Sequence, residues 1–92
     1  MGKMEILPFN KSGLCREGRL KGVSKDIISE RLGFKPNIED DPCKVVYSWG
    51  FTVNGVHCGI WDYKESHLYG EFSTYGPKHI FVDLFGEKHV KQ

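Results

Sequence analysis

The stretch that decides the fold is VVYSWGFTVNGVHCGIWDY, residues 45–63, in which two apolar-alternating runs flank Asn54-Gly55. A two-residue Asn-Gly loop is the strongest short-range signal for a type I′ β-hairpin. Because this loop fixes the pairing of the two strands, it also assigns every side chain to one of two faces. We therefore expect a β-hairpin at the centre of the fold.

One face of this hairpin is almost wholly apolar and should pack on the helices as the core. The register set by the turn predicts four cross-strand pairs: Val53 with Val56, Phe51 with Cys58, Trp49 with Ile60, and Tyr47 with Asp62. The carboxylate of Asp62 is the exception on this face. We expect it to bond the Tyr47 hydroxyl or a helix end, the alternative being a functional pair with His79.

The opposite face is a candidate binding surface. Gly50 and Gly59 face each other there, and paired glycines within a sheet often mark the close approach of a backbone or a ligand. Trp61 stands beside this gap, Tyr63 follows it, and His57 lies on the same face. Such aromatic side chains favour a stacking platform for a base, a planar ligand or a partner side chain. The alternative is that N-terminal residues cover this face.

Two short helices are predicted, one on either side of the hairpin. The first spans residues 24–32, with Ser24 as its N-cap and Gly33 as its C-terminal glycine. The second spans residues 77–85 and begins at a proline, which is favoured in the first turn. Both carry apolar stripes that should face the core: Ile27, Ile28 and Leu32 in the first, and Ile80, Phe81, Leu84 and Phe85 in the second.

The remaining segments predict less regular structure. Residues 71–75 should form a third strand, and residues 4–9 a short strand that Pro8 confines to a sheet edge. Residues 10–22, rich in glycine and basic side chains, are typical of a loop. The polar tail, residues 87–92, should fray.

These elements predict an α+β fold built as one small domain, residues 1–92. An antiparallel sheet of three to four strands would pack on two short helices in the order (β)-α-β-β-β-α, after a partly irregular segment, residues 1–22. A chain of 92 residues has room for one modest core and no second domain.

Composition limits the setting in which the protein works. The net charge is +1, so the whole chain is neither a polycation nor an acidic nucleic-acid mimic. Cys15, Cys43 and Cys58 are odd in number and lack a C-x-x-C spacing, which favours a reducing cytoplasm over a disulfide framework. Since there is no apolar run of signal-peptide or membrane-span length, we expect no membrane partner.

Thr74, Lys78 and His79 form a candidate anion site at the start of the second helix. A helix N-terminus offers unbonded backbone N–H groups, and these three side chains add a hydroxyl and positive charge. Pro77 removes one N–H donor, so the alternative is an ordinary strand-to-helix turn.

The N-terminal quarter is basic and predicts possible contacts with phosphates. Residues 1–25 carry a net charge of +4, and the basic side chains that would make these contacts are Arg16, Arg19, Lys21 and Lys25. The segment lacks a recognition helix or an RNA-binding signature, so nucleic-acid binding is not the favoured reading.

No catalytic or metal-binding constellation is predicted. His57 and Cys58 are adjacent on a strand and therefore point to opposite faces, and Cys58 falls on the core side. Nucleophilic catalysis needs a thiol or hydroxyl beside a base, and no such set can be assigned. We expect no enzymatic activity, no metal and no cofactor.

The sequence thus favours a small non-enzymatic binding protein that occupies a protein partner's surface, of the accessory or inhibitor type. Small phage proteins have this general build, which is an analogy of size rather than of motif. Two alternatives remain: a binder of a nucleotide or other small anionic ligand, and a nucleic-acid-binding module. A homodimer formed through a half-exposed sheet face also remains open.

Overall fold

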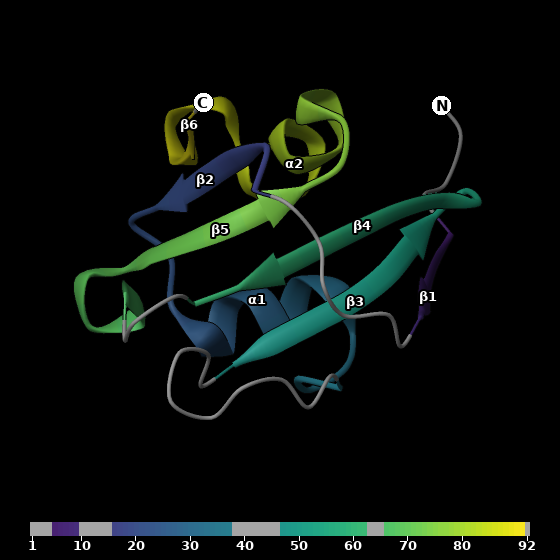
Figure 1. Cartoon of the computed structure of the whole chain (residues 1–92), viewed down its shortest axis with the longest axis horizontal. Coiled ribbons are helices and arrows are strands. Elements are labelled where there is room, and N and C mark those ends of the chain that lie inside the picture. Colours follow the sequence, from purple (N-terminus) through teal and green to yellow (C-terminus); the bar gives the residue numbers. More distant parts are fainter. Residues whose placement is uncertain (1–4, 10–15, 38–46, 63–65, 92) are drawn as a thin grey trace.

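The computed structural model describes residues 5–9, 16–37, 47–62 and 66–91. Figure 1 shows the arrangement of its elements. In chain order they are β1 (Ile6–Pro8), β2 (Gly18–Lys21), α1 (Lys25–Leu32), β3 (Ser48–Val53), β4 (Val56–Trp61), the 3-10 turn η1 (Ser66–Tyr69), β5 (Glu71–Tyr75), α2 (Lys78–Phe85), the 3-10 turn η2 (Glu87–His89) and β6 (Val90–Lys91).

The strands of the described residues form one antiparallel sheet in the order β1-β3-β4-β5-β2-β6. The α+β class is confirmed, but the prediction of three to four strands is wrong because the sheet has six. The unpredicted strands are β2, expected to be a loop, and β6, expected to be a fraying tail. These strands have four and two residues, and each has one buried side chain, Leu20 in β2 and Val90 in β6, so neither shows an alternating apolar pattern.

The central hairpin has the predicted register. Val53 pairs with Val56, and the pairs toward the open end follow as expected, through Ser48 with Trp61. Asn54 and Gly55 both have positive φ, at 51° and 83°, as a type I′ turn requires. The hairpin is therefore specified by its local sequence.

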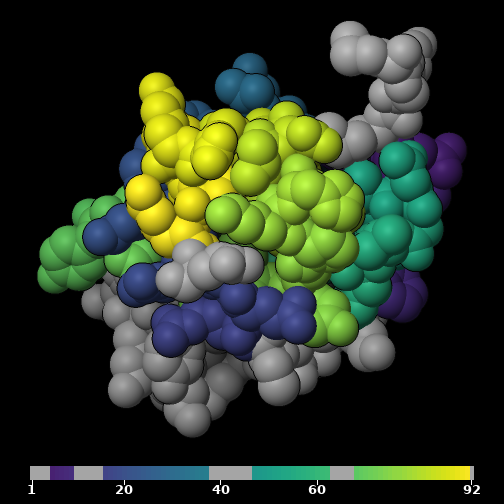
Figure 2. All heavy atoms as spheres, turned by 90° about the horizontal axis from the view of Figure 1, so that it is seen from above, coloured from purple at the N-terminus to yellow at the C-terminus, as the bar shows by residue number. Residues whose placement is uncertain are grey.

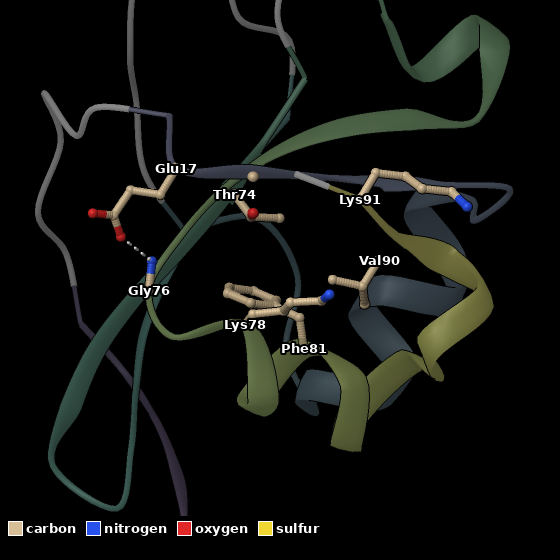
Figure 3. Close-up of a pocket in the computed structure, with 8 residues that line it drawn as sticks. Glu17, Thr74, Gly76, Lys78, Phe81, Val90 and Lys91 are labelled. Carbon is tan, nitrogen blue, oxygen red and sulfur yellow. Dashed lines mark hydrogen bonds between the residues drawn. The ribbon is translucent and has the colours of Figure 1, made fainter.

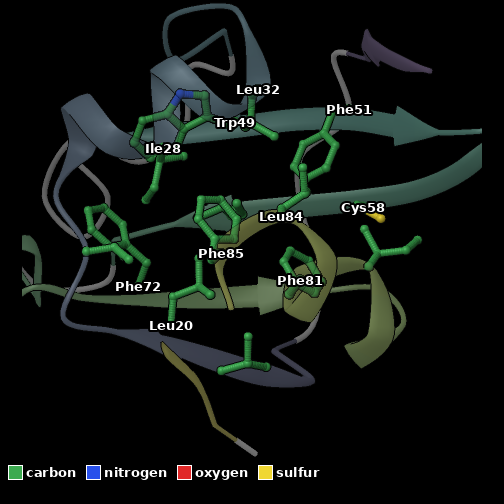
Figure 4. Packing of buried hydrophobic residues seen from close by; sticks show 14 of the residues in the cluster. Leu20, Ile28, Leu32, Trp49, Phe51, Cys58, Phe72, Phe81, Leu84 and Phe85 are labelled. Carbon is green, nitrogen blue, oxygen red and sulfur yellow. The ribbon is translucent and has the colours of Figure 1, made fainter. Parts of the chain in front are cut away.

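The core lies between one face of the sheet and the two helices (Figure 4). The hairpin contributes five fully buried apolar side chains, which are Trp49, Phe51, Val53, Cys58 and Ile60. The helices contribute Ile28 and Leu32 from α1 and Ile80, Phe81, Leu84 and Phe85 from α2. Val56 was expected on this face but is 42% exposed, because it lies at the hairpin tip next to the turn.

Helix α1 is capped by the predicted residues at both ends. The Ser24 side chain accepts a hydrogen bond from the Ile27 N–H at 3.2 Å, and Gly33 ends the helix in the left-handed region at φ 89°. Ile27, expected in the apolar stripe, is exposed. Only Ile28 and Leu32 are buried, so tertiary packing on a narrow stripe stabilises this eight-residue helix.

Helix α2 buries its whole predicted stripe, and Pro77 is its N-cap rather than its first residue. The chain beyond Gly86 forms η2 and β6, which pairs with β2. His89 Nδ1 lies 2.7 Å from the Lys21 carbonyl oxygen, so this nitrogen donates its proton to that acceptor. Together, strand pairing and this bond dock the C-terminal segment on the sheet.

Strand β1 lies at the other edge of the sheet, as Pro8 predicted. It pairs there with β3. Asn54 ties β1 to the hairpin turn, since it accepts the Glu5 N–H on its side chain at 2.8 Å and donates its own N–H to the Glu5 carbonyl at 2.9 Å. Further along β3, the Asn37 side-chain amide bonds both backbone groups of Gly50. Its oxygen accepts the Gly50 N–H at 2.8 Å and its nitrogen donates to the Gly50 carbonyl at 3.0 Å.

Candidate binding sites

The turn between β5 and α2, the predicted anion site, binds a carboxylate of the chain itself. The Gly76 N–H donates to the Glu17 carboxylate at 3.1 Å (Figure 3). Gly76 has φ 124°, and a Cβ placed on it would lie 2.8 Å from the Cys58 sulfur. The turn is thus packed tightly on the core, and an external anion would have to displace Glu17.

The hollow beside this turn is small. Water-sized molecules can centre in only about 10 Å³ of it, room for about one water. Thr74, which is buried, and Lys78 line it, and the Lys78 side chain runs toward Val90 (Figure 3). His79 is exposed and is not among the residues that line it. The structure therefore brings together Thr74 and Lys78 without His79, in a space too small for a nucleotide.

The predicted aromatic platform is described only in part, because Tyr63 lies outside the described residues. Trp61 is half-buried between Ser48 and Ser73, its partners on the neighbouring strands. Gly50 and Gly59 face each other as expected, and both are buried. An open platform at Trp61 and Tyr63 stays a prediction.

Beside the two glycines, three aromatic rings form a row on the same face. The His57 ring lies 4.9 Å from the ring of Phe9 and 5.4 Å from that of Tyr75, between centroids. Phe9 donates its N–H to Gly50, and Tyr75 pairs with Gly59, so the outer rings belong to segments that flank the glycine pair. His57, a predicted site residue, is thus half-buried among aromatic neighbours.

The four predicted basic residues do not form one unpaired basic patch. Arg19 and Lys21 lie in β2, Arg16 lies before it, and Lys25 is the first residue of α1. Arg19 forms an ion pair with Glu71 at 3.4 Å. Lys25 lies 3.3 Å from the Asp26 carboxylate. Because two of the four cations have acidic neighbours, the basic charge available to a phosphate backbone is reduced.

Lys25 also borders a larger groove, which we call the α1 groove. It is lined by Lys25, Asp26, Ser29, Lys35, Pro36 and Tyr47, and its volume is about 390 Å³. Small-molecule sites commonly measure about 300–1,000 Å³, so this groove has the size of a ligand site. No local sequence pattern predicts this groove, because Tyr47 is brought to α1 only by the tertiary fold.

The 3-10 turn η1 carries the most exposed large apolar side chains among the described residues. Leu68 is 66% exposed and Tyr69 is 83% exposed. The turn, green in Figures 1 and 2, stands out at one end of the molecule. The sequence of residues 64–70 by itself predicts a plain loop. The available signal was two adjacent large apolar residues in a loop. This signal is weak as long as the exposure of the two side chains is unknown.

This turn is fixed to the body of the protein. The Gly70 carbonyl accepts hydrogen bonds from Gly22 N–H at 2.8 Å and Val23 N–H at 3.3 Å. Gly70 itself has φ 68°, which favours glycine. Because Gly70 is anchored and β5 follows directly, the end of η1 that carries Leu68 and Tyr69 is held on the sheet.

The thiol of Cys58 and the carboxylate of Asp62 are both buried in the fold. Burial raises the pKa of the Cys58 thiol to about 11, so the reactive thiolate is scarce at neutral pH. Asp62 is buried and its carboxylate accepts the Tyr47 backbone N–H at 2.7 Å. Within the described ranges, no group of three or more His, Cys, Asp or Glu could hold a metal, and no helix is long and apolar enough to cross a membrane.

No family model, curated protein or solved structure matches this chain. A functional assignment therefore rests on the surfaces described above.

Proposed function

We propose that this protein is a non-enzymatic binding domain that acts by occupying a surface of a protein partner. The observation that carries the proposal is the pair Leu68 and Tyr69, exposed side by side on η1. Contiguous exposed apolar surface often marks a protein–protein interaction site, whereas apolar side chains exposed singly are ordinary. Tyrosine is also among the residues that most often dominate binding energy at interfaces.

The anchoring of η1 supports a role in recognition. A flexible loop would lose conformational freedom on binding, and each immobilised side chain costs about 0.5–1.5 kcal/mol. The two hydrogen bonds to the Gly70 carbonyl hold the backbone of this turn before any partner arrives. Leu68 and Tyr69 would therefore enter an apolar pocket of the partner with little reorganisation of the main chain.

The charges around the turn suggest which charge the partner carries at the border of its binding pocket. Lys21 pairs with Glu71 in the sheet register, and Arg19 forms an ion pair with the same carboxylate. Within the part of the chain that the structure describes, these two cations and one anion leave a net charge of +1 beside the turn. An apolar pocket with an acidic border would complement it. In this proposal the protein works in a reducing cytoplasm, in keeping with the free thiol of Cys58.

The test is affinity capture with the tagged protein as bait, comparing wild type with the double variant Leu68→Ser, Tyr69→Ser. We expect a partner to be retained by the wild type and lost by the double variant. The matched control is Leu7→Ser, which changes an exposed leucine on β1, far from η1 along the long axis of the molecule. This control should retain the partner.

A second variant, Trp61→Ala, separates the two candidate surfaces. If Trp61→Ala abolishes capture while the double variant retains it, the binding surface lies on the sheet and not on η1. Equal capture by the wild type and all variants would count against both surfaces. Each variant must first show a far-UV circular dichroism spectrum and a melting transition like those of the wild type.

A further inference from the structure

The α1 groove has walls from two separate parts of the chain. Helix α1 supplies Lys25, Asp26 and Ser29, and the segment after it supplies Lys35 and Pro36. Tyr47, a half-buried residue just before β3, also lines the groove. The groove therefore joins an aromatic surface to two lysines.

The aromatic wall is held in place from behind. The Tyr47 N–H donates to the Asp62 carboxylate at 2.7 Å, and its carbonyl accepts the Asp62 N–H at 3.0 Å. Its ring lies 6.4 Å from that of Trp49, between centroids. The wall is thus fixed to the core of the sheet by contacts that a ligand would leave undisturbed.

Ser29 lines the groove and carries a hydroxyl group. Ser29 Oγ accepts a hydrogen bond from the Trp49 indole N–H at 3.3 Å. Accepting this bond does not use the serine proton, so the hydroxyl retains a donor for an acceptor in the groove. A phosphate or carboxylate oxygen is such an acceptor.

The charges favour an anion of low charge. Lys25 Nζ lies 5.5 Å from the centre of the Tyr47 ring and 3.3 Å from the Asp26 carboxylate. Lys35 is exposed and forms no ion pair with any residue that the structure describes. Among the described residues that line the groove, two lysines attract an anion, while Asp26 repels a ligand of several negative charges.

We propose that the α1 groove binds a small planar organic anion. A phosphate or carboxylate group lies between Lys25 and Lys35 and accepts from Ser29. The flat part of the ligand packs against Tyr47 and Pro36. A nucleoside monophosphate and an aromatic carboxylate share this chemistry. This site is independent of Leu68 and Tyr69, so its failure would leave the proposed partner-binding role untouched.

The experiment is a titration of the ¹⁵N-labelled wild-type protein with AMP, ATP, benzoate and inorganic phosphate, followed by amide chemical shifts. We expect saturable binding of AMP or benzoate with Kd below about 1 mM, the weak end of specific affinity. The shifts should centre on Ser29, Lys35 and Tyr47. AMP should bind more tightly than ATP, and inorganic phosphate, which lacks a planar part, more weakly than AMP.

Two lysine variants make the test specific. Lys35→Ala should weaken binding of AMP or benzoate at least tenfold, whereas Lys88→Ala, which removes an exposed lysine on η2, should leave it unchanged. Binding of AMP alone identifies a phosphate ligand, and binding of benzoate alone identifies a carboxylate ligand. The proposal is overturned if neither compound saturates by 10 mM, about tenfold above that limit. It is equally overturned if Lys35→Ala binds like wild type, or if the shifts centre on Lys78.

Discussion

The core face of the hairpin and the turn η1 place similar side chains in opposite environments. Trp49 and Phe51 are wholly buried against the helices, whereas Leu68 and Tyr69 face solvent on an anchored turn. Burial of the first pair contributes to the free energy of folding, and the second pair adds little to it. Stability and recognition therefore depend on different residues, and substitutions should separate the two properties.

The largest expected effect on stability is at the hairpin core. Phe51→Ala should lower the free energy of unfolding by about 3–5 kcal/mol, because it removes a fully buried ring packed 6.5 Å from Phe81, between centroids. Urea denaturation measures this loss. The control is Phe9→Ala, a 43% exposed ring, which should cost about 1 kcal/mol or less. Equal losses in the two variants would contradict the contrast between buried and exposed aromatics.

The next effect is at the turn packed on Cys58. Gly76→Ala should cost about 1–3 kcal/mol, since the new methyl group meets the Cys58 sulfur at 2.8 Å in a backbone conformation that favours glycine. Gly33→Ala is the matched control. Gly33 also has a positive φ, but no atom lies within 4 Å of the added carbon.

A double-mutant cycle isolates the steric part of this effect. In a Cys58→Ala background, Gly76→Ala should cost less than in wild type, because the sulfur is gone. Unfolding free energies of the four proteins give the coupling directly. A coupling of zero would mean that backbone strain alone accounts for the loss.

A smaller effect depends on pH. The pKa of Cys58 is raised by burial from 9.0 to about 11, so the unfolded chain loses this proton first as pH rises. Its contribution to stability is intact below pH 9 and is lost between pH 9 and 11, by at most about 1.4 kcal/mol per pH unit.

The check is the stability difference between wild type and Cys58→Ala at pH 8 and at pH 10.5. Other groups that titrate in this range are common to both proteins, so their effects largely cancel in the difference. We expect the advantage of wild type to shrink at the higher pH. A difference that stays constant would show that the thiol ionises equally in the folded and unfolded states.

The smallest effect on stability is expected at η1. Leu68→Ala and Tyr69→Ala should each change the unfolding free energy by about 0.5 kcal/mol or less, because both side chains are mostly exposed. The same substitutions should weaken partner binding by about 2 kcal/mol or more if the pair anchors the interface. Thermal melts and binding isotherms on the same samples measure both quantities. A large loss of stability would show that these side chains pack on the body of the protein.

The elements with strong local signals were predictable from the sequence. Asn54-Gly55 specified the hairpin register, Ser24 and Gly33 bounded α1, and the four apolar residues of α2 are all buried. These features depend on interactions within a few residues. In such cases local sequence and final fold agree.

The remaining structure depends on contacts distant in sequence. Strand β2 is held by pairing with β5, and β6 by pairing with β2 and by the bond from His89 to the Lys21 carbonyl. None of these partners is adjacent in the chain. The α1 groove likewise required Tyr47 to be placed beside α1. The prediction of an anion site did not include Glu17, because this residue is 59 positions away in the sequence from Gly76, whose N–H it accepts.

The bonds between Asn37 and Gly50 have a consequence for behaviour at high concentration. An exposed strand edge can recruit strands from other molecules, and proteins that leave one open tend to aggregate. The Asn37 amide presents to β3 the same donor and acceptor as the peptide group of a neighbouring strand. Strand addition at Gly50 is thereby blocked by the Asn37 side chain, together with the Phe9 N–H, which also donates to the Gly50 carbonyl at 2.9 Å. We expect the concentrated protein to stay monodisperse by light scattering, and Asn37→Ala to expose a point of self-association.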